Sequence, residues 1–224
     1  MPLPEPRQME WLFHFTLILA VLDAVGVFAL ILICYFLYKA YRISNQRLFL
    51  FFFVGYAVLA AGESARFLLL ATAFIARARL LMFFLAHNMG PLPQLFQTIA
   101  LLFIAGGYAL ELAQARVEKT SLAILPLPLL LALQRPWSGL FVLLTFINLA
   151  LLVFIILNAS SVYLASRSRR TLLIVIAFLL LLLSNILMLP AVVRVSDELF
   201  IISKLLYLTG LLTFLLLAIE VAQA

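Results

Sequence analysis

The chain has 224 residues, of which 67% are hydrophobic and only 11% are charged. A soluble domain is about half apolar and a quarter charged, so this composition excludes a soluble fold and indicates an integral membrane protein in a lipid bilayer. The net charge of +6 is spread over the loops between apolar runs, which indicates membrane orientation rather than nucleic-acid binding.

Seven apolar runs predict transmembrane helices, because a bilayer core about 30 Å thick needs about 20 residues of helix. The predicted ranges are 11–38, 48–76, 93–114, 120–134, 138–163, 170–193 and 198–222. The run at 120–134 is short and contains Pro126 and Pro128, each of which removes a backbone donor, so whether it spans is left open. The fold class predicted is an all-α, polytopic bundle of seven transmembrane helices, with residues 1–224 forming a single transmembrane domain.

The basic residues of the loops set the expected orientation, since Lys and Arg collect on the cytoplasmic side. With the N-terminus outside, the inner loops hold Lys39, Arg42, Arg47, Arg116, Lys119, Arg167, Arg169 and Arg170. The outer segments hold fewer, namely Arg7, Arg77, Arg79, Arg135 and Arg194. We therefore expect a multi-pass protein of the cell membrane with its N-terminus outside and its C-terminus in the cytoplasm.

The second half of the chain repeats the polar pattern of the first, which indicates an internal duplication. Shifts of 125 and 121 residues pair Asp23 with Asn148, Glu63 with Ser184 and Ser64 with Asn185, and a shift of 104 aligns the third predicted helix with the seventh. Chance alignment of leucine-rich helices is the alternative. If the repeat is real, the plan is a first three-helix repeat with an outer loop at 1–116, a linker helix at 117–136 and a second three-helix repeat at 137–224. An odd linker makes the two copies parallel.

Polar residues in these helices are predicted to form one layer. Counting about 1.5 Å per residue from the interfacial tryptophans or from the helix ends gives comparable depths, in the middle to outer half of the bilayer, for Asp23, Asn148, Glu63, Asn185 and Lys204. The candidate ligand- or ion-binding residues are Asp23, Glu63, Ser64, Arg66, Asn148, Asn185 and Lys204. A charge at this depth costs about 2.5–3.5 kcal/mol on insertion, so we expect the charged members to face the bundle interior and to pair.

The expected pairs follow from spacing. Arg66 is three residues after Glu63 on the same helical face and is predicted to be its nearest partner. Lys204 would neutralise Asp23 if the first and last helices are neighbours. Alternatively, one carboxyl is protonated, because burial disfavours its charged form.

Two interpretations of the layer follow. It is either a binding or translocation site, open to the outer side, or a set of interhelical contacts that hold the bundle together. The structural interpretation is favoured for Asn148, Ser184 and Asn185. The functional one is favoured for Asp23 and Glu63, because two acids are a costly means of joining helices.

Sequence motifs of enzymes are absent: no GxSxG, HExxH, CxxC or glycine-rich phosphate loop occurs, so no enzymatic activity is expected. The single cysteine, Cys34, excludes an intrachain disulfide, and no cofactor or metal is predicted.

The leading hypothesis is a protein that binds or translocates a small polar solute, an ion or a proton. The parallel three-one-three plan resembles, in topology alone, the small sugar transporters of the PQ-loop type. The Pro93–Gln94 pair stands at the start of the third helix, which is not where that family carries its signature. The alternatives are a non-catalytic scaffold subunit of a larger membrane complex, with other subunits or a second copy as partners, and a seven-helix sensor, for which Lys204 is the one candidate Schiff-base lysine.

Overall fold

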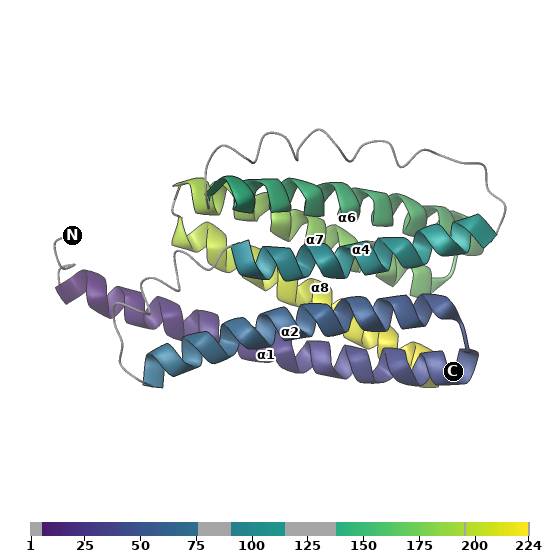
Figure 1. Ribbon diagram of the computed structural model, residues 1–224, viewed down its shortest axis with the longest axis horizontal. Helices are drawn as coiled ribbons and strands as arrows, with labels where there is room; N and C mark the ends of the chain where they lie inside the picture. Colours follow the sequence, from purple (N-terminus) through teal and green to yellow (C-terminus); the bar gives the residue numbers. More distant parts are fainter. Residues whose placement is uncertain (1–5, 76–90, 115–137, 195, 224) are drawn as a thin grey trace.

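The computed structural model describes residues 6–75, 91–114, 138–194 and 196–223, and these residues form long helices (Figure 1). The helices are α1 (Pro6–Ser44), α2 (Arg47–Ile75), α4 (Pro91–Gln114), α6 (Ser138–Ser166), α7 (Arg169–Arg194) and α8 (Asp197–Gln223). All six are long and apolar enough to cross a membrane. The described part of the chain is therefore all-helical, and its helices are those of a multi-pass membrane protein.

The predicted helix at 120–134 lies outside the described residues. The described part of the chain supplies six candidate spans, so the predicted count of seven is not confirmed. The boundaries of the other predicted helices agree with the structure within about three residues, except at the first helix. That helix is longer than predicted at both ends, since it begins at Pro6 and continues to Ser44. Proline is favoured in the first turn of a helix, where its missing N–H needs no partner.

Two tight turns join consecutive helices at the same end of the molecule. Asn45, between α1 and α2, adopts a positive φ of 54°, and its N–H bonds the carbonyl of Tyr41 at 2.8 Å. Arg167, between α6 and α7, has φ 47° and bonds the carbonyl of Tyr163 at 2.7 Å. Both are left-handed caps that satisfy a terminal carbonyl and stop the helix.

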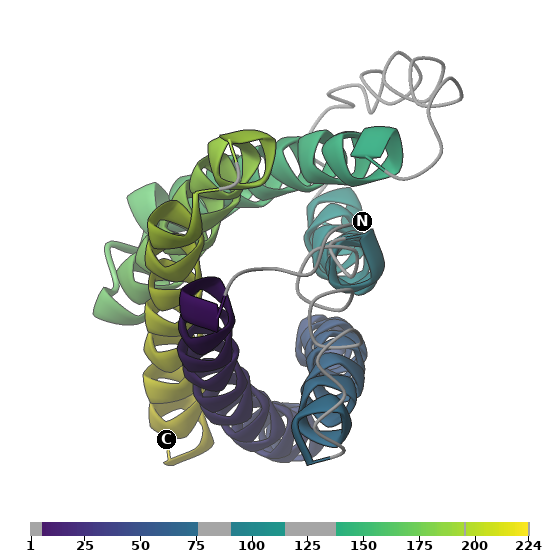
Figure 2. The same ribbon diagram turned by 90° about the vertical axis from the view of Figure 1, so that its left-hand side faces the viewer.

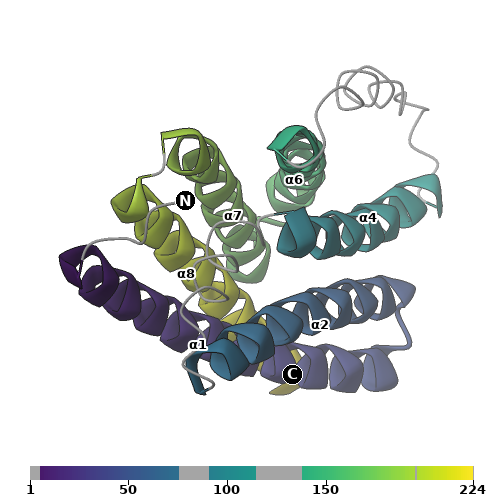
Figure 3. The same ribbon diagram turned by 60° about the vertical axis from the view of Figure 1, so that its left-hand side comes forward.

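The six described helices form a ring when viewed along their axes (Figure 2). Neighbours around the ring are α1, α2, α4, α6, α7 and α8, and α8 packs against α1 to close it. In Figure 3, α4 lies between α2 and α6. The first and last helices are therefore neighbours, as the expected pairing of Asp23 with Lys204 requires.

The helix directions divide the ring into two sets of three. Along the chain, α1, α2 and α4 alternate in direction, and so do α6, α7 and α8 (Figure 1). At the join between the sets, however, α4 and α6 run in the same direction. The end of α4 and the start of α6 consequently lie at opposite ends of the ring.

One apolar core contains side chains from all six described helices. In α1 the buried Leu30 and Ile33 follow Asp23, whereas in the antiparallel α2 the buried Tyr56 and Leu59 precede Glu63. Both pairs therefore lie on the side of the two tight turns. The buried charged residues lie on the other side of this core, toward the N-terminal end of α1.

Candidate polar site inside the helix ring

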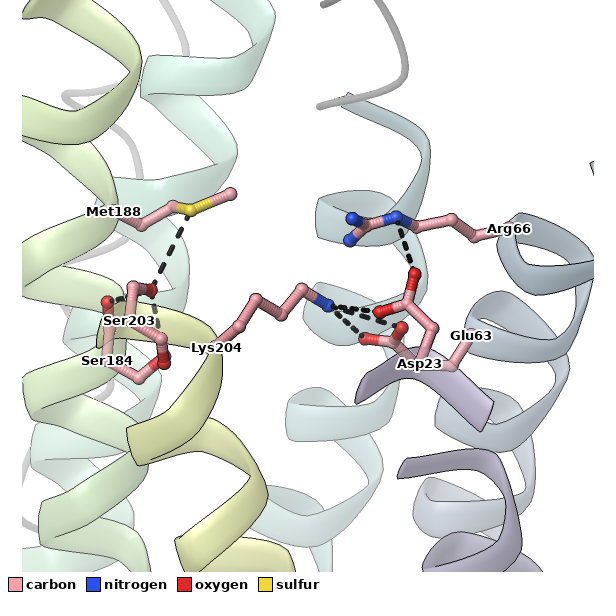
Figure 4. Close-up of polar contacts among 7 residues, drawn as sticks. All are labelled: Asp23, Glu63, Arg66, Ser184, Met188, Ser203 and Lys204. Carbon is pink, nitrogen blue, oxygen red and sulfur yellow. Dashed lines mark hydrogen bonds and ion pairs between the residues drawn. The ribbon is translucent and has the colours of Figure 1, made fainter. Parts of the chain in front are cut away.

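Four charged side chains from three helices meet inside the ring, and we call them the charged cluster: Asp23, Glu63, Arg66 and Lys204 (Figure 4). Lys204 Nζ lies 3.2 Å from Asp23 Oδ1 and 3.3 Å from Glu63 Oε1. Arg66 Nε lies 3.2 Å from Asp23 Oδ2. The cluster holds two acids and two bases, so its net charge is zero.

The order of the helices around the ring explains why these residues meet. Asp23 comes from α1, which lies between α2 and α8 in the ring. Glu63 and Arg66 project from α2, and Lys204 projects from α8, so the Glu63–Lys204 pair passes across the inside of the ring (Figure 4). These side chains therefore face one another and not the lipid.

The pairing within the cluster differs in part from the prediction. Lys204 pairs with Asp23, as expected, but it also bonds both oxygens of Glu63, at 3.3 and 3.4 Å. Arg66 pairs with Asp23 and not with Glu63, so that part of the prediction was wrong. The i, i+3 spacing places Glu63 and Arg66 on one face, but contacts between helices decide which acid the guanidinium reaches.

All four members are buried, with exposed fractions of 2% for Asp23, 7% for Glu63, 8% for Arg66 and 9% for Lys204. Aromatic rings flank the two cations: Arg66 Cζ lies 5.8 Å from the centre of the Phe200 ring, and Lys204 Nζ lies 5.2 Å from that of Tyr207. Charged groups shielded from water in this way interact more strongly than they would at a surface.

Among the described residues, a few buried polar atoms lack a hydrogen-bond partner, and one of them belongs to the charged cluster. Asp23 Oδ2 is one, because Arg66 approaches it without the alignment of a hydrogen bond. The hydroxyl of Tyr56, in the apolar core, is another. Buried polar groups normally have a hydrogen-bond partner, so buried polar atoms without one require an explanation.

Asn148 does not join the charged cluster. Its amide nitrogen donates to Gln94 Oε1 at 2.6 Å, and its Oδ1 accepts from the Thr98 hydroxyl at 2.7 Å. We call these three residues, which join α4 to α6, the amide cluster. All three are buried, and the contacts fit the structural interpretation of Asn148.

The other polar candidates are also separate from the charged cluster. Ser184 of α7 and Ser203 of α8 each donate a hydroxyl to the other's carbonyl, at 2.9 Å. Asn185 donates to the Leu181 carbonyl of its own helix at 2.9 Å. Ser64 is only half-buried and contributes no contact to the cluster. Of the seven predicted site residues, the structure thus brings four together.

Gln94, Thr98 and Ser203 are buried polar residues that the sequence analysis did not select. A signal for two of them exists, because Gln94 and Thr98 are four residues apart and therefore share one helical face. Nothing comparable distinguishes Ser203, since only its contact with Ser184 across two helices reveals its role.

Comparisons of this chain with protein-family models, with curated proteins and with solved structures found no match.

Proposed function

We propose that this chain is a seven-pass membrane protein that binds or translocates a small polar solute, an ion or a proton at the charged cluster. The observation that carries the proposal is the Glu63–Lys204 pair, which crosses the inside of the ring and meets Asp23 and Arg66 there. Ionisable residues inside a membrane bundle are costly and usually mark the path of a solute or ion.

The seventh crossing is supported by the directions of α4 and α6. Because they run in the same direction, the chain between them has to return from one end of the ring to the other (Figure 1). A crossing at 120–134 supplies that return. It also completes a parallel three-one-three plan, in which α1, α2 and α4 correspond to α6, α7 and α8.

The proposed orientation has the N-terminus outside and the C-terminus in the cytoplasm. It is supported by the two tight turns, which lie at one end of the ring and carry Arg42, Arg47, Arg167, Arg169 and Arg170 at or beside them. Basic residues near helix ends favour the cytoplasmic side. The charged cluster then lies on the outer side of the apolar core.

A purely structural role for the charged cluster is the competing interpretation, and the energetics disfavour it. Replacing a buried ion-pair network with packed apolar residues is often neutral or stabilising, so four buried charges are a poor means of joining helices. Nothing in the proposed role requires catalysis, and we propose a non-enzymatic protein.

The proposal is tested by measuring how small solutes change the melting temperature of the purified protein. The informative variant is Glu63→Gln combined with Lys204→Met, which removes one charge of each sign and leaves the Asp23–Arg66 pair intact. A solute at 100 times its dissociation constant stabilises the folded state by about 2.7 kcal/mol. We expect at least one solute class in a panel of monovalent ions, organic ions, zwitterions and polyols to raise the melting temperature of the wild type.

That stabilisation should be lost in the double variant. A matched control is Asn158→Leu, because among the described residues the Asn158 side chain bonds only the Phe154 carbonyl of its own helix. This control should keep the response of the wild type. If the wild type and the double variant respond equally to every solute, or if neither responds, the charged cluster is not a binding site.

A further inference from the structure

The charged cluster is a linear series of alternating charges, and each of its two end members contacts only one opposite charge within the cluster. In order, Arg66 contacts Asp23, Asp23 contacts Lys204, and Lys204 contacts Glu63. The two inner members each contact two opposite charges, whereas Arg66 and Glu63 each contact one. The two ends of this series are thus a guanidinium and a carboxylate on the same helix, α2.

The small exposed surface of the charged cluster is divided unequally among its members. The side chains of Arg66, Lys204 and Glu63 keep 9%, 11% and 9% of their surface exposed, whereas that of Asp23 keeps 1%. Asp23 is therefore the most deeply buried member, and it is the counter-charge of Arg66 and Lys204. The exposed surface that remains belongs to two cations and one carboxylate.

Arg66 also has unused hydrogen-bonding capacity. Arg66 approaches Asp23 through Nε, and Figure 4 shows its two terminal nitrogens turned away from that carboxylate. A guanidinium has five N–H donors in a fork that matches a carboxylate.

Charge balance decides which ligand fits the charged cluster. The cluster is neutral as it stands, so a bound anion or cation would leave one charge uncompensated in a medium of low dielectric constant, which is costly. A molecule that carries one positive and one negative group keeps the total at zero. A neutral polyol also keeps the balance, but it forgoes the stronger, charge-assisted hydrogen bonds that the two end groups offer.

We infer that the charged cluster binds a small zwitterion of the α-amino-acid type, with its carboxylate on Arg66 and Lys204 and its ammonium group on Glu63. Such a ligand links the two end members, Arg66 and Glu63, so that every charged group of the cluster contacts at least two groups of opposite charge. Glu63 and Arg66 are three residues apart on one helical face, where Cβ atoms are about 5–6 Å apart, so the ligand has to be compact. This inference rests on the proposed function and names its substrate class.

The test is equilibrium binding of radiolabelled glycine to the wild-type protein in lipid nanodiscs, with unlabelled competitors. Alanine should displace glycine at concentrations at least tenfold lower than acetate, methylammonium or glycerol, which carry one charge of either sign or none. This comparison of competitors requires no variant, so it remains decisive if substitutions in the cluster impair folding. Arg66→Gln and Glu63→Gln should each weaken glycine binding at least tenfold, while Asn158→Leu leaves it unchanged.

The outcomes separate this inference from the proposed function. If acetate, methylammonium, a metal ion or glycerol binds as well as the zwitterions do, and binding depends on the cluster, the zwitterion class is wrong and the proposed function stands. If neither glycine nor alanine binds, and no other solute does, both are wrong.

Discussion

At the scale of single residues, Lys204 decides how the charged cluster is held together. Its ammonium group contacts carboxylates from two different helices, and both acids depend on it. The sequence predicted that Asp23, Glu63, Arg66 and Lys204 are buried and paired, because charges at that depth in a membrane require partners. It could not predict that Arg66 reaches Asp23, since spacing along α2 relates Arg66 only to residues of its own helix.

This arrangement predicts a non-additive effect of neutralising Lys204. Lys204→Met alone leaves two buried acids against one guanidinium, and an uncompensated buried charge costs about 3–5 kcal/mol. Adding Glu63→Gln restores neutrality, so the double variant should unfold at a higher temperature than the single one. Thermal unfolding in detergent measures this difference. A single variant as stable as the double would show that Lys204 and Glu63 are not coupled.

At the scale of helices, the positions of all six described elements followed from hydropathy, but their contacts did not. Long apolar runs fix where a helix lies, because every backbone group in lipid has to be satisfied within the helix. Close approach depends on a few small residues whose neighbours the sequence does not reveal. Gly55 of α2 is such a residue: a Cβ atom there would lie 2.8 Å from the Ala100 carbonyl oxygen of α4.

The contact at Gly55 predicts opposite outcomes for two glycines. Gly55→Ala should destabilise the protein by about 1–3 kcal/mol, as overpacking does, because the obstructing atom belongs to the backbone of α4. Gly26→Ala in α1 is the matched control, since nothing lies within 4 Å of a Cβ atom there. Removing a helical glycine favours the helix, so this control should unfold at the same temperature or slightly higher. Equal losses for both variants would contradict the packing of α2 against α4.

At the scale of the whole molecule, the ring explains why residues far apart in the sequence meet. Closure of the ring by α8 against α1 brings Lys204 to Asp23. The sequence predicted the Asp23–Lys204 pair only on the condition that the first and last helices are neighbours. It could not establish that condition, because packing and loop length together set the order of helices in a ring. The shared level of Asp23, Glu63 and Lys204, by contrast, could be predicted by counting residues along each helix.

The parallel directions of α4 and α6 predict the sides of the membrane on which their ends lie. Single cysteines at Gln114, the end of α4, and at Ser138, the start of α6, should react with an impermeant maleimide from opposite sides. The background is Cys34→Ser, which removes the only native thiol. Labelling of sealed, oriented vesicles measures this accessibility. Reaction of both positions from the same side would exclude a seventh crossing.

The central claim, that acids and bases from separate helices share one interior, is tested most directly by crosslinking across the ring. Glu63→Cys with Lys204→Cys, in the Cys34→Ser background, keeps the remaining charges balanced and places two thiols where the salt bridge was. Leu68 and Leu205 lie on the same two helices but are 60% and 46% exposed, so a cysteine pair there is the matched control. A short bismaleimide should join positions 63 and 204 within one chain and leave the control pair unjoined. Failure to crosslink 63 to 204 in the folded protein, or equal crosslinking of the control, would contradict the shared interior.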